Sequence, residues 1–367
     1  MRKSIQSLFI RMTVSIFLFL FIYLTGCSMD ENHYSADDYY NIEKIDAHLH
    51  INSDNGALIE QARDDNFRLL TINVDDEDLL PLEKQEKIAI SASKTYPDIV
   101  AFVATFHMAG WDNANWQERT IAHLDSFIAL GASGVKVWKN IGMEFRDSKG
   151  NLVMIDDPKF DPIFDHLRNK KMVVLGHLGE PKSCWSPLDE IHVNYVREYY
   201  TNHPQFHMYL HPEMPSYEDQ IEARDRMLEK NMNLEFVGAH LASLEWSVDV
   251  LAHFLDRFPH ADVDMAARMG NVQYQSSQDR EKVRQFFIDY QDRILYATDL
   301  VQSPDIEAKV IKQQAHDMWL DDWKYLVTDS TFVSKEFPGT YQGLALPKEV
   351  VEKIFSINAK NKYNKAW

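Results

Sequence analysis

Residues 44–50 read KIDAHLH, and this stretch decides how the rest of the chain is interpreted. Side chains of a β-strand alternate between its two faces, so Asp46, His48 and His50 are expected on one face. The apolar residues before and between them are then expected to face covering helices. The pattern predicts one buried strand that carries two imidazoles on a single side.

The chain downstream repeats this unit, a short run rich in Val and Ile followed by a helical pattern. One helix face, for example, is indicated by the spacing of Leu251, Phe254, Leu255 and Phe258. Strands are expected at Lys44–His50, Arg68–Val74, Ile99–His107, Gly134–Lys139, Met172–His177, Leu234–His240, Ala261–Met265 and Ile294–Thr298. Eight alternating units without a linker favour an α/β fold, a closed (β/α)8 TIM barrel, over an open doubly wound sheet. Residues 42–367 are expected to form this single barrel domain, with helices at its C-terminal end.

The composition fits a folded chain. Of 367 residues, 45% are hydrophobic and 26% are charged, with only 13 Gly and 13 Pro, which excludes a disordered or collagen-like protein. The 38 basic and 56 acidic side chains give a formal net charge of −18. Such a surface repels a nucleic-acid backbone, so nucleic acid is not an expected partner.

The N-terminus has the features of an export signal. Three basic residues, Arg2, Lys3 and Arg11, precede the apolar run Thr13–Leu24, which is too short to span a bilayer. The sequence Leu24-Thr25-Gly26-Cys27 resembles the lipobox of bacterial lipoproteins. That resemblance implies a signal peptide over residues 1–26, cleavage before Cys27 and a lipid on the Cys27 sulfur.

A lipidated Cys27 would place the protein in the cell envelope, with the outer membrane as its expected location. Residues 27–41 are then expected to be a polar tether, and the anchor would be the only contact with the membrane. The alternative is an uncleaved anchor in which Cys27 is an ordinary residue. Cys184 is the only other cysteine, so after lipidation no intrachain disulfide is expected.

Metal-ligand residue types fall where the predicted strands end. His177 ends the fifth strand, His240 ends the sixth, and Asp299 follows the eighth. Barrel enzymes keep their chemistry at the carboxyl ends of the strands, where these residues would meet His48 and His50. Neutral imidazole and carboxylate are donors that zinc, iron, manganese and nickel accept. The sequence therefore predicts a divalent-metal site.

With Lys136 on the fourth strand, the pattern resembles the amidohydrolase superfamily. The resemblance covers the whole predicted barrel: His-x-His on strand one, lysine on strand four, histidines ending strands five and six, and aspartate ending strand eight. The stretches 45–48 (IDAH) and 295–299 (LYATD) look most like the branch that contains sugar-lactone hydrolases and the aminocarboxymuconate semialdehyde decarboxylase group.

The resemblance implies one or two divalent ions, with zinc expected. It assigns six residues to the metal site: His48, His50, Lys136, His177, His240 and Asp299. In that family the lysine is often carboxylated and bridges two metals, so a carboxylated Lys136 is one expectation. With a single ion, His177 becomes the third imidazole and His240 is free to polarise the substrate or transfer a proton. Asp299 and His240 are the expected catalytic residues.

Further candidates surround the predicted barrel mouth. The long segment between strands five and six is rich in Trp, Tyr, His and Pro, and is expected to form a lid that sets specificity. Asp46 has two interpretations, as an orienting partner of a ligand histidine or as a core carboxylate bonded to backbone donors. The candidate substrate-binding residues, each with packing or solvation as its alternative, are Trp138, Lys139, Glu180, His211 and Arg268.

Three functions are compatible with this pattern. The first is a metal-dependent hydrolase that cleaves a lactone, amide or ester of a small molecule carrying a carboxylate or carbohydrate. The second is a metal-dependent, non-oxidative decarboxylase. The third is a lipid-tethered binding protein without catalysis, against which the intact donor set argues. A small molecule is the expected partner, and a homo-oligomer is compatible with the sequence.

Overall fold

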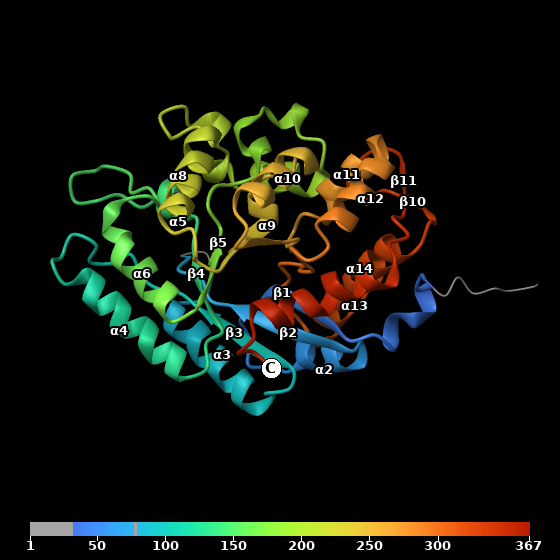
Figure 1. Cartoon of the computed structure of the whole chain (residues 1–367), viewed down its shortest axis with the longest axis horizontal. Helices are drawn as coiled ribbons and strands as arrows, with labels where there is room; N and C mark the ends of the chain where they lie inside the picture. Colours follow the sequence, from blue (N-terminus) through green and yellow to red (C-terminus); the bar gives the residue numbers. More distant parts are fainter. Residues whose placement is uncertain (1–31, 77–78) are drawn as a thin grey trace, which may run out of the picture. The chain divides into compact units, whose positions relative to one another are not determined.

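Parallel strands alternate with helices in the computed structural model, which describes residues 32–76 and 79–367 (Figure 1). The main sheet within these residues has the order β8-β7-β6-β5-β4-β3-β2-β1-β9, with every pairing parallel. Its strands are β1 (Lys44–Ile51), β2 (Phe67–Ile72), β3 (Val100–Ala104), β4 (Gly134–Val137), β5 (Val173–Gly176), β6 (Phe236–Gly238), β7 (Ala261–Asp264), β8 (Ile294–Leu295) and β9 (Val301–Gln302).

The two short strands β8 and β9 are parts of one eighth strand position, which closes the sheet on β1. The Ala47 amide donates to the Tyr296 carbonyl (3.0 Å), and the His50 amide donates to the Leu300 carbonyl (2.8 Å). Between these bonds, the Asp299 amide donates to the His48 carbonyl (2.8 Å). The predicted (β/α)8 barrel is therefore confirmed, with its eighth strand interrupted at Asp299.

Amphipathic helices cover the strands. In α10, for example, the buried residues Val248, Leu251, Phe254 and Leu255 lie on one face. The α-helices are α2 (Ala57–Asp64), α3 (Leu82–Thr95), α4 (Trp116–Ala129), α5 (Asn140–Met143), α6 (Asp161–Asn169), α7 (Asn194–Asn202), α8 (Tyr217–Lys230), α9 (Ala239–Ala242), α10 (Val248–Arg257), α11 (Met269–Gln278), α12 (Arg280–Asp289), α13 (Ala308–Val327), α14 (Lys348–Glu352) and α15 (Asn358–Lys362).

Short irregular elements complete the fold. The 3₁₀ helices are η1 (Ala36–Tyr40), η2 (Pro158–Phe160), η3 (Lys182–Trp185), η4 (Leu188–Glu190), η5 (Pro204–Phe206) and η6 (Met208–Leu210). A π-helical turn, η7 (Lys353–Ile357), joins α14 to α15, and β10 (Thr331–Val333) pairs with β11 (Thr340–Gln342) in an antiparallel hairpin.

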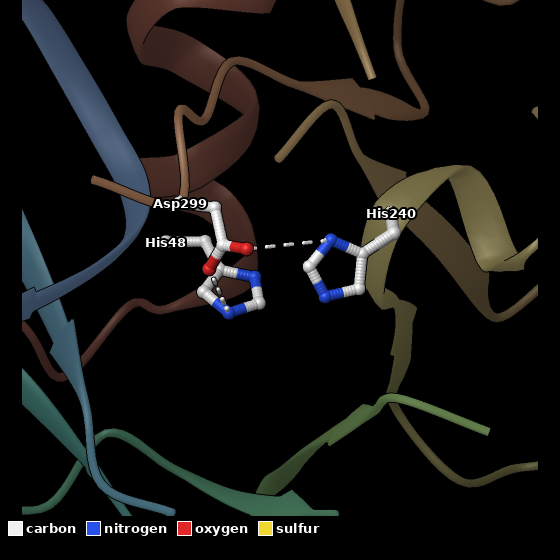
Figure 2. A group of neighbouring side chains, drawn as sticks. All are labelled: His48, His240 and Asp299. Carbon is white, nitrogen blue, oxygen red and sulfur yellow. Dashed lines mark ion pairs between the residues drawn. The ribbon is translucent and has the colours of Figure 1, made fainter. Parts of the chain in front are cut away.

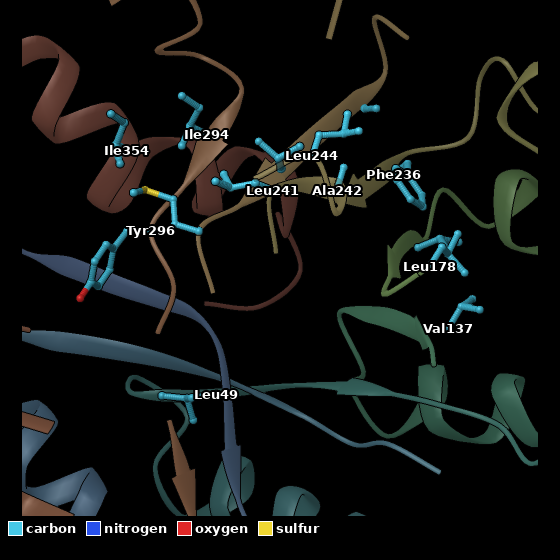
Figure 3. Packing of buried hydrophobic residues seen from close by; sticks show 14 of the residues in the cluster. Leu49, Val137, Leu178, Phe236, Leu241, Ala242, Leu244, Ile294, Tyr296 and Ile354 are labelled. Carbon is cyan, nitrogen blue, oxygen red and sulfur yellow. The ribbon is translucent and has the colours of Figure 1, made fainter. Parts of the chain in front are cut away.

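Two apolar layers form most of the core. One lies inside the barrel and joins side chains from six strands with Tyr363 of the C-terminal segment. The larger layer lies between strands and helices and includes Leu49, Phe236 and Tyr296 (Figure 3). The C-terminal segment covers the amino ends of the strands, where Trp367 Nε1 donates to the Ile99 carbonyl (3.4 Å). The opposite end of the barrel, where the strands finish, is left for the candidate site.

The eight predicted strands all exist, but most of them end earlier than predicted. The alternation predicted for β1 is wrong at its start. Ile45 and Ala47 pack inside the barrel, whereas Asp46 points outward to α13, where its Oδ2 accepts from Trp319 Nε1 (2.9 Å). The pairing of β1 with β2 shifts register between Asp46 and Leu49, as at a β-bulge. This shift returns His48 to the inner face.

The segment before β1 also differs from the prediction. We expected residues 27–41 to be a polar tether, yet η1 packs on the barrel with Tyr39 fully buried. Trp323 Nε1 donates to the Ser35 carbonyl (3.2 Å), which fixes this segment to α13. The predicted signal peptide and Cys27 lie outside the described residues. Within the described residues, no helix combines the length and apolarity needed to cross a bilayer.

Candidate active site

The two histidines of β1 point their Nε2 atoms toward Asp299. His48 Nδ1 donates to Asp264 Oδ2 (2.7 Å), and His50 Nδ1 donates to the Ile72 carbonyl (2.8 Å). These acceptors fix both imidazole orientations and leave each Nε2 atom as the metal-binding nitrogen. Asp299 Oδ1 lies 3.6 Å from His48 Nε2 and 3.2 Å from His50 Nε2.

Asp299 occupies the interruption of the eighth strand. Its φ of +67° lies in the left-handed region, which turns the carboxylate toward the histidines. Burial alone would raise the pKa of Asp299, but His240, His50 and His48 outweigh burial and hold the pKa well below its usual range. Asp299 is therefore an anion at neutral pH and suits both metal binding and proton acceptance.

His240 reaches the same point from α9, whose backbone is left-handed and not α-helical. His240, Leu241, Ala242 and Ser243 all have φ between +55° and +58°, although none is glycine. Each left-handed residue costs roughly 1–2 kcal/mol, so the surrounding structure must hold this turn. The His240 amide donates to Asp264 Oδ1 (2.7 Å), which fixes the start of the turn.

One group of donor atoms meets the requirements for a cation. Ligand atoms of His48, His240 and Asp299 all lie within 4.8 Å of one another (Figure 2). His177 Nδ1 lies 3.2 Å from His240 Nε2. Burial lowers the pKa of His177 to about 3 and that of His240 well below its usual value, so both imidazoles are neutral, as metal ligands must be. The residues present therefore fit a divalent metal.

Lys136 lies inside this group. Its side chain is fully buried, and its Nζ is 3.2 Å from His48 Nε2. Burial lowers the pKa of Lys136 to about 8, which reduces the cost of a neutral amine beside the metal ligands. Only a neutral amine can be carboxylated, so this environment is compatible with the modification that the superfamily resemblance implies.

A cavity of about 230 Å³ adjoins the donor group, and its lining includes His50, His177, His240 and Asp299. Four of the five predicted substrate-binding residues also line it: Trp138, Lys139, Glu180 and Arg268. Burial would raise the pKa of Glu180, but the buried Lys139 ammonium outweighs burial and lowers it, so these two side chains form an ion pair. Arg268 is buried as well, and its Nε has no hydrogen-bond partner within the described part of the chain.

The structure does not bring His211 to this cavity. Its Nε2 donates to the Pro204 carbonyl (3.0 Å) in the loop between β5 and β6. Asp46 behaves as the core carboxylate of our second interpretation, because Thr298 donates both its amide (3.1 Å) and its hydroxyl (2.6 Å) to it. Neither residue belongs to the group around Asp299.

Two features of the site were missed from the sequence. Asp264 accepts hydrogen bonds from His48 Nδ1 and from the His240 amide. It is a carboxylate at the end of β7, so the strand-end rule that pointed to the other site residues could also have pointed to it. Helix α7, in the long loop, contributes Tyr195 and Tyr199 to the cavity wall. The sequence had indicated Glu180 of that loop, but no local spacing had indicated either tyrosine.

A parallel (β/α)8 barrel with histidines and an aspartate gathered at its strand ends defines a class of enzymes that act through a bound divalent metal. The family model described as amidohydrolase matches residues 45–365, and the chain belongs to this family. This confirms the superfamily membership expected from the sequence. No curated protein matches the chain in sequence.

Solved structures show the same fold at low sequence identity. An uncharacterised TIM-barrel protein from Bordetella bronchiseptica is 14% identical, with a TM-score of 0.53 over 89% of this chain and 99% of that chain. A 2,6-dihydroxybenzoate decarboxylase from Rhizobium is 12% identical, with a TM-score of 0.50 over 88% of this chain and 99% of that chain. At these identities the similarity concerns the barrel itself.

Proposed function

We propose that the protein is a metal-dependent hydrolase that cleaves a lactone, amide or ester bond in a small molecule bearing a carboxylate or carbohydrate. The observation that carries this proposal is the placement of Asp299. Its ionised carboxylate lies beside three histidines and lines the cavity, so one group can contact both the metal and the substrate.

The metal would be held by His48, His50 and Asp299, with His177 or His240 completing the set. When bound, a divalent cation such as zinc lowers the pKa of water and polarises a carbonyl. Two ions would require carboxylation of the Lys136 amine, and metal analysis with and without added bicarbonate separates the one-ion and two-ion forms.

The residues of the chain then have distinct tasks. Asp299 accepts the proton of the attacking water and returns it to the leaving group. His240 orients or polarises the scissile carbonyl. Arg268, with a free Nε–H, binds an anionic group of the substrate, and the ring of Trp138 forms a wall of the cavity. Lys139 is neutralised by Glu180, which leaves Arg268 as the stronger anion-binding residue.

A non-oxidative decarboxylase is the second candidate, and the cavity wall favours it. Trp138 and Tyr199 provide aromatic surfaces, and Arg268 lines the same cavity. These features suit an aromatic carboxylic acid, whose ring would stack on the wall while its carboxylate meets the guanidinium. Release of CO2 without consumption of water would identify this reaction.

The decisive experiment measures turnover of the protein reconstituted with zinc or manganese. Lactones, esters, amides and aromatic acids are assayed for acid release and for CO2. We expect acid release to fall at least 100-fold in Asp299→Asn and to stay within twofold of wild type in the exposed control Asp305→Asn. CO2 release would establish the second candidate, and equal activity in both variants would refute the role of Asp299.

We also propose that the protein is a lipoprotein of the cell envelope, anchored through Cys27. The support is the lipobox-like sequence at residues 24–27. Labelling with a radioactive fatty acid in a bacterial host should modify the wild-type chain and not Cys27→Ser. Equal labelling of both chains, or of neither, would contradict the anchor.

A further inference from the structure

One face of α8 supplies buried polar side chains to the catalytic end of the barrel. Tyr217, Gln220 and Arg224 are spaced by three and four residues, so they share a helix face. All three are buried. Buried polar groups are costly unless they are hydrogen-bonded, so their partners show what this face is for.

The partners are backbone carbonyls of two loops on that end. Arg224 Nη1 donates to the Ala242 carbonyl (2.5 Å), and the Tyr217 hydroxyl donates to the next carbonyl, that of Ser243 (2.6 Å). Gln220 Nε2 donates to the Gly142 carbonyl (2.6 Å), in the kinked segment after β4. Two of these three bonds therefore end on the left-handed turn that begins at His240.

The turn is bonded both internally and to its surroundings. The Ser243 amide donates to the His240 carbonyl (3.2 Å) and the Leu244 amide to the Leu241 carbonyl (3.0 Å), while the Ser243 hydroxyl donates to the Gly179 carbonyl (2.7 Å). Leu241 and Ala242 are anchored in the apolar core (Figure 3). Because left-handed backbone is disfavoured for all four residues, hydrogen bonds from outside the turn must contribute to keeping it.

Arg224 is itself fixed and lies outside the cavity lining. Its Nε and Nη2 donate to Asp225 Oδ1 (3.0 and 2.7 Å), and the guanidinium carbon lies 4.4 Å from the centre of the Phe254 ring. Because Nε and Nη2 of the guanidinium bond to Asp225, Nη1 is the nitrogen that donates to the Ala242 carbonyl. Arg224 can therefore act on the reaction only through the turn.

We propose that Arg224 and Tyr217 are positioning residues for His240. They hold the carbonyls of residues 242 and 243, which keeps the left-handed turn closed and the His240 imidazole directed at Asp299 and His177. The inference rests on the proposed function, since it requires His240 to belong to the working site.

The test is a double-mutant cycle between Arg224→Met and His240→Asn. Affinity for Co2+ or Zn2+ is measured by chelator competition, and kcat and KM are measured on the best substrate found. We expect Arg224→Met to lower, by about 10–100-fold, the same parameter that His240→Asn lowers. In the His240→Asn background the effect of Arg224→Met should shrink to less than about threefold. A residue that acts only by positioning the His240 imidazole has nothing left to position once that imidazole has been removed.

Matched variants separate positioning from general damage. Arg224→Lys should recover part of the loss, and Tyr217→Phe, which removes one hydroxyl, should show a smaller loss of the same parameter. Arg226→Met, on the same helix but half exposed and paired with Asp156, should stay within twofold of wild type. Should Arg224→Met fail to fold, Tyr217→Phe takes its place in the cycle.

Two results would overturn the inference. One is an unchanged Arg224→Met protein alongside an impaired His240→Asn protein. The other is an Arg224→Met loss of equal size in both backgrounds, which would indicate a purely structural role. A fully active His240→Asn protein would instead contradict the role of His240 in the proposed function, and the positioning inference with it.

Discussion

The end of β1 and the end of β6 deliver histidines to the same point by opposite means. His48 and His50 belong to a paired strand, and their Nδ1 atoms bond to acceptors on two other strands, Asp264 of β7 and the Ile72 carbonyl of β2. His240 follows a three-residue strand and sits on a left-handed turn held by side chains from α8. The comparison teaches that a strand paired within the sheet holds its histidines through bonds to other strands, whereas a strained turn depends on side chains from a helix.

The largest expected effect comes from breaking the β6 end at Gly238. A Cβ at this position would lie 2.5 Å from the Ala242 Cβ and 3.0 Å from the Ala242 Cα, so the turn must move. We expect Gly238→Ala to lower kcat/KM at least 100-fold and to destabilise the fold by about 1–3 kcal/mol. Enzyme assays and urea unfolding measure the two effects.

The control for this variant is Gly56→Ala before α2. Its Cβ would meet only the Tyr96 hydroxyl, at 3.7 Å, and its φ of −76° suits any residue. Activity and stability should therefore stay close to wild type. Equal activity of Gly238→Ala and Gly56→Ala would show that the turn tolerates displacement and that His240 needs no fixed backbone.

The next largest effect is expected at Asp264, whose carboxylate bonds to residues at both ends. It accepts from His48 Nδ1 (2.7 Å) and from the His240 amide (2.7 Å). Loss of such an outer partner costs about 10–100-fold in metal affinity. We expect this loss in Asp264→Asn, measured by chelator competition, with Asp305→Asn unchanged. His50 offers no equivalent variant, because its support is a backbone carbonyl.

A smaller effect is expected from pH, which changes the stability of the fold through the buried imidazole of His177. Burial lowers the pKa of His177 from its usual 6.5 to about 3. Between these values the unfolded chain binds the proton and the folded chain does not, so stability is full above pH 6.5 and falls as the pH falls. For His177 alone, the metal-free protein should lose about 2 kcal/mol between pH 7 and pH 5.

Urea unfolding at the two pH values measures this loss. His177→Gln should reduce the loss of unfolding free energy between pH 7 and pH 5 by most of the expected amount, about 2 kcal/mol. His253→Gln, at an exposed position on α10, should leave the pH dependence of stability unchanged. An unaltered slope in His177→Gln would mean that this histidine is protonated in the folded protein and is not poised as a neutral ligand.

The comparison also explains what the sequence could predict. Strand periodicity and the rule that chemistry gathers at strand ends are local signals, and they located His48, His50, His177, His240 and Asp299. The same rule applied to β7 would have included Asp264. These residues lie where their strands stop, so their convergence needs only the barrel topology.

Other features depend on contacts that no local pattern encodes. The left-handed turn carries no glycine among residues 240–243, and its only sequence signal is Gly238, which makes room for Ala242. The β1 bulge depends on pairing with β2 and on the Trp319 indole of α13, far along the chain. Both features are set by tertiary contacts, which override the simple alternation of a strand.

The smallest effect on the metal site is expected from a test of that bulge. Asp46 points away from the cavity, and burial raises its pKa to about 6 against the opposing hydrogen bonds from Thr298 and Trp319. Asp46→Asn replaces one acceptor oxygen by an NH2 group that faces the N–H and O–H donors of Thr298 and Trp319. We expect this substitution to lower the free energy of unfolding by about 1–3 kcal/mol. Its metal affinity should stay within about threefold of wild type, in contrast to Asp264→Asn. A loss of metal affinity as large as that of Asp264→Asn would mean that Asp46 orients the β1 histidines after all, and that the bulge does not separate it from the site.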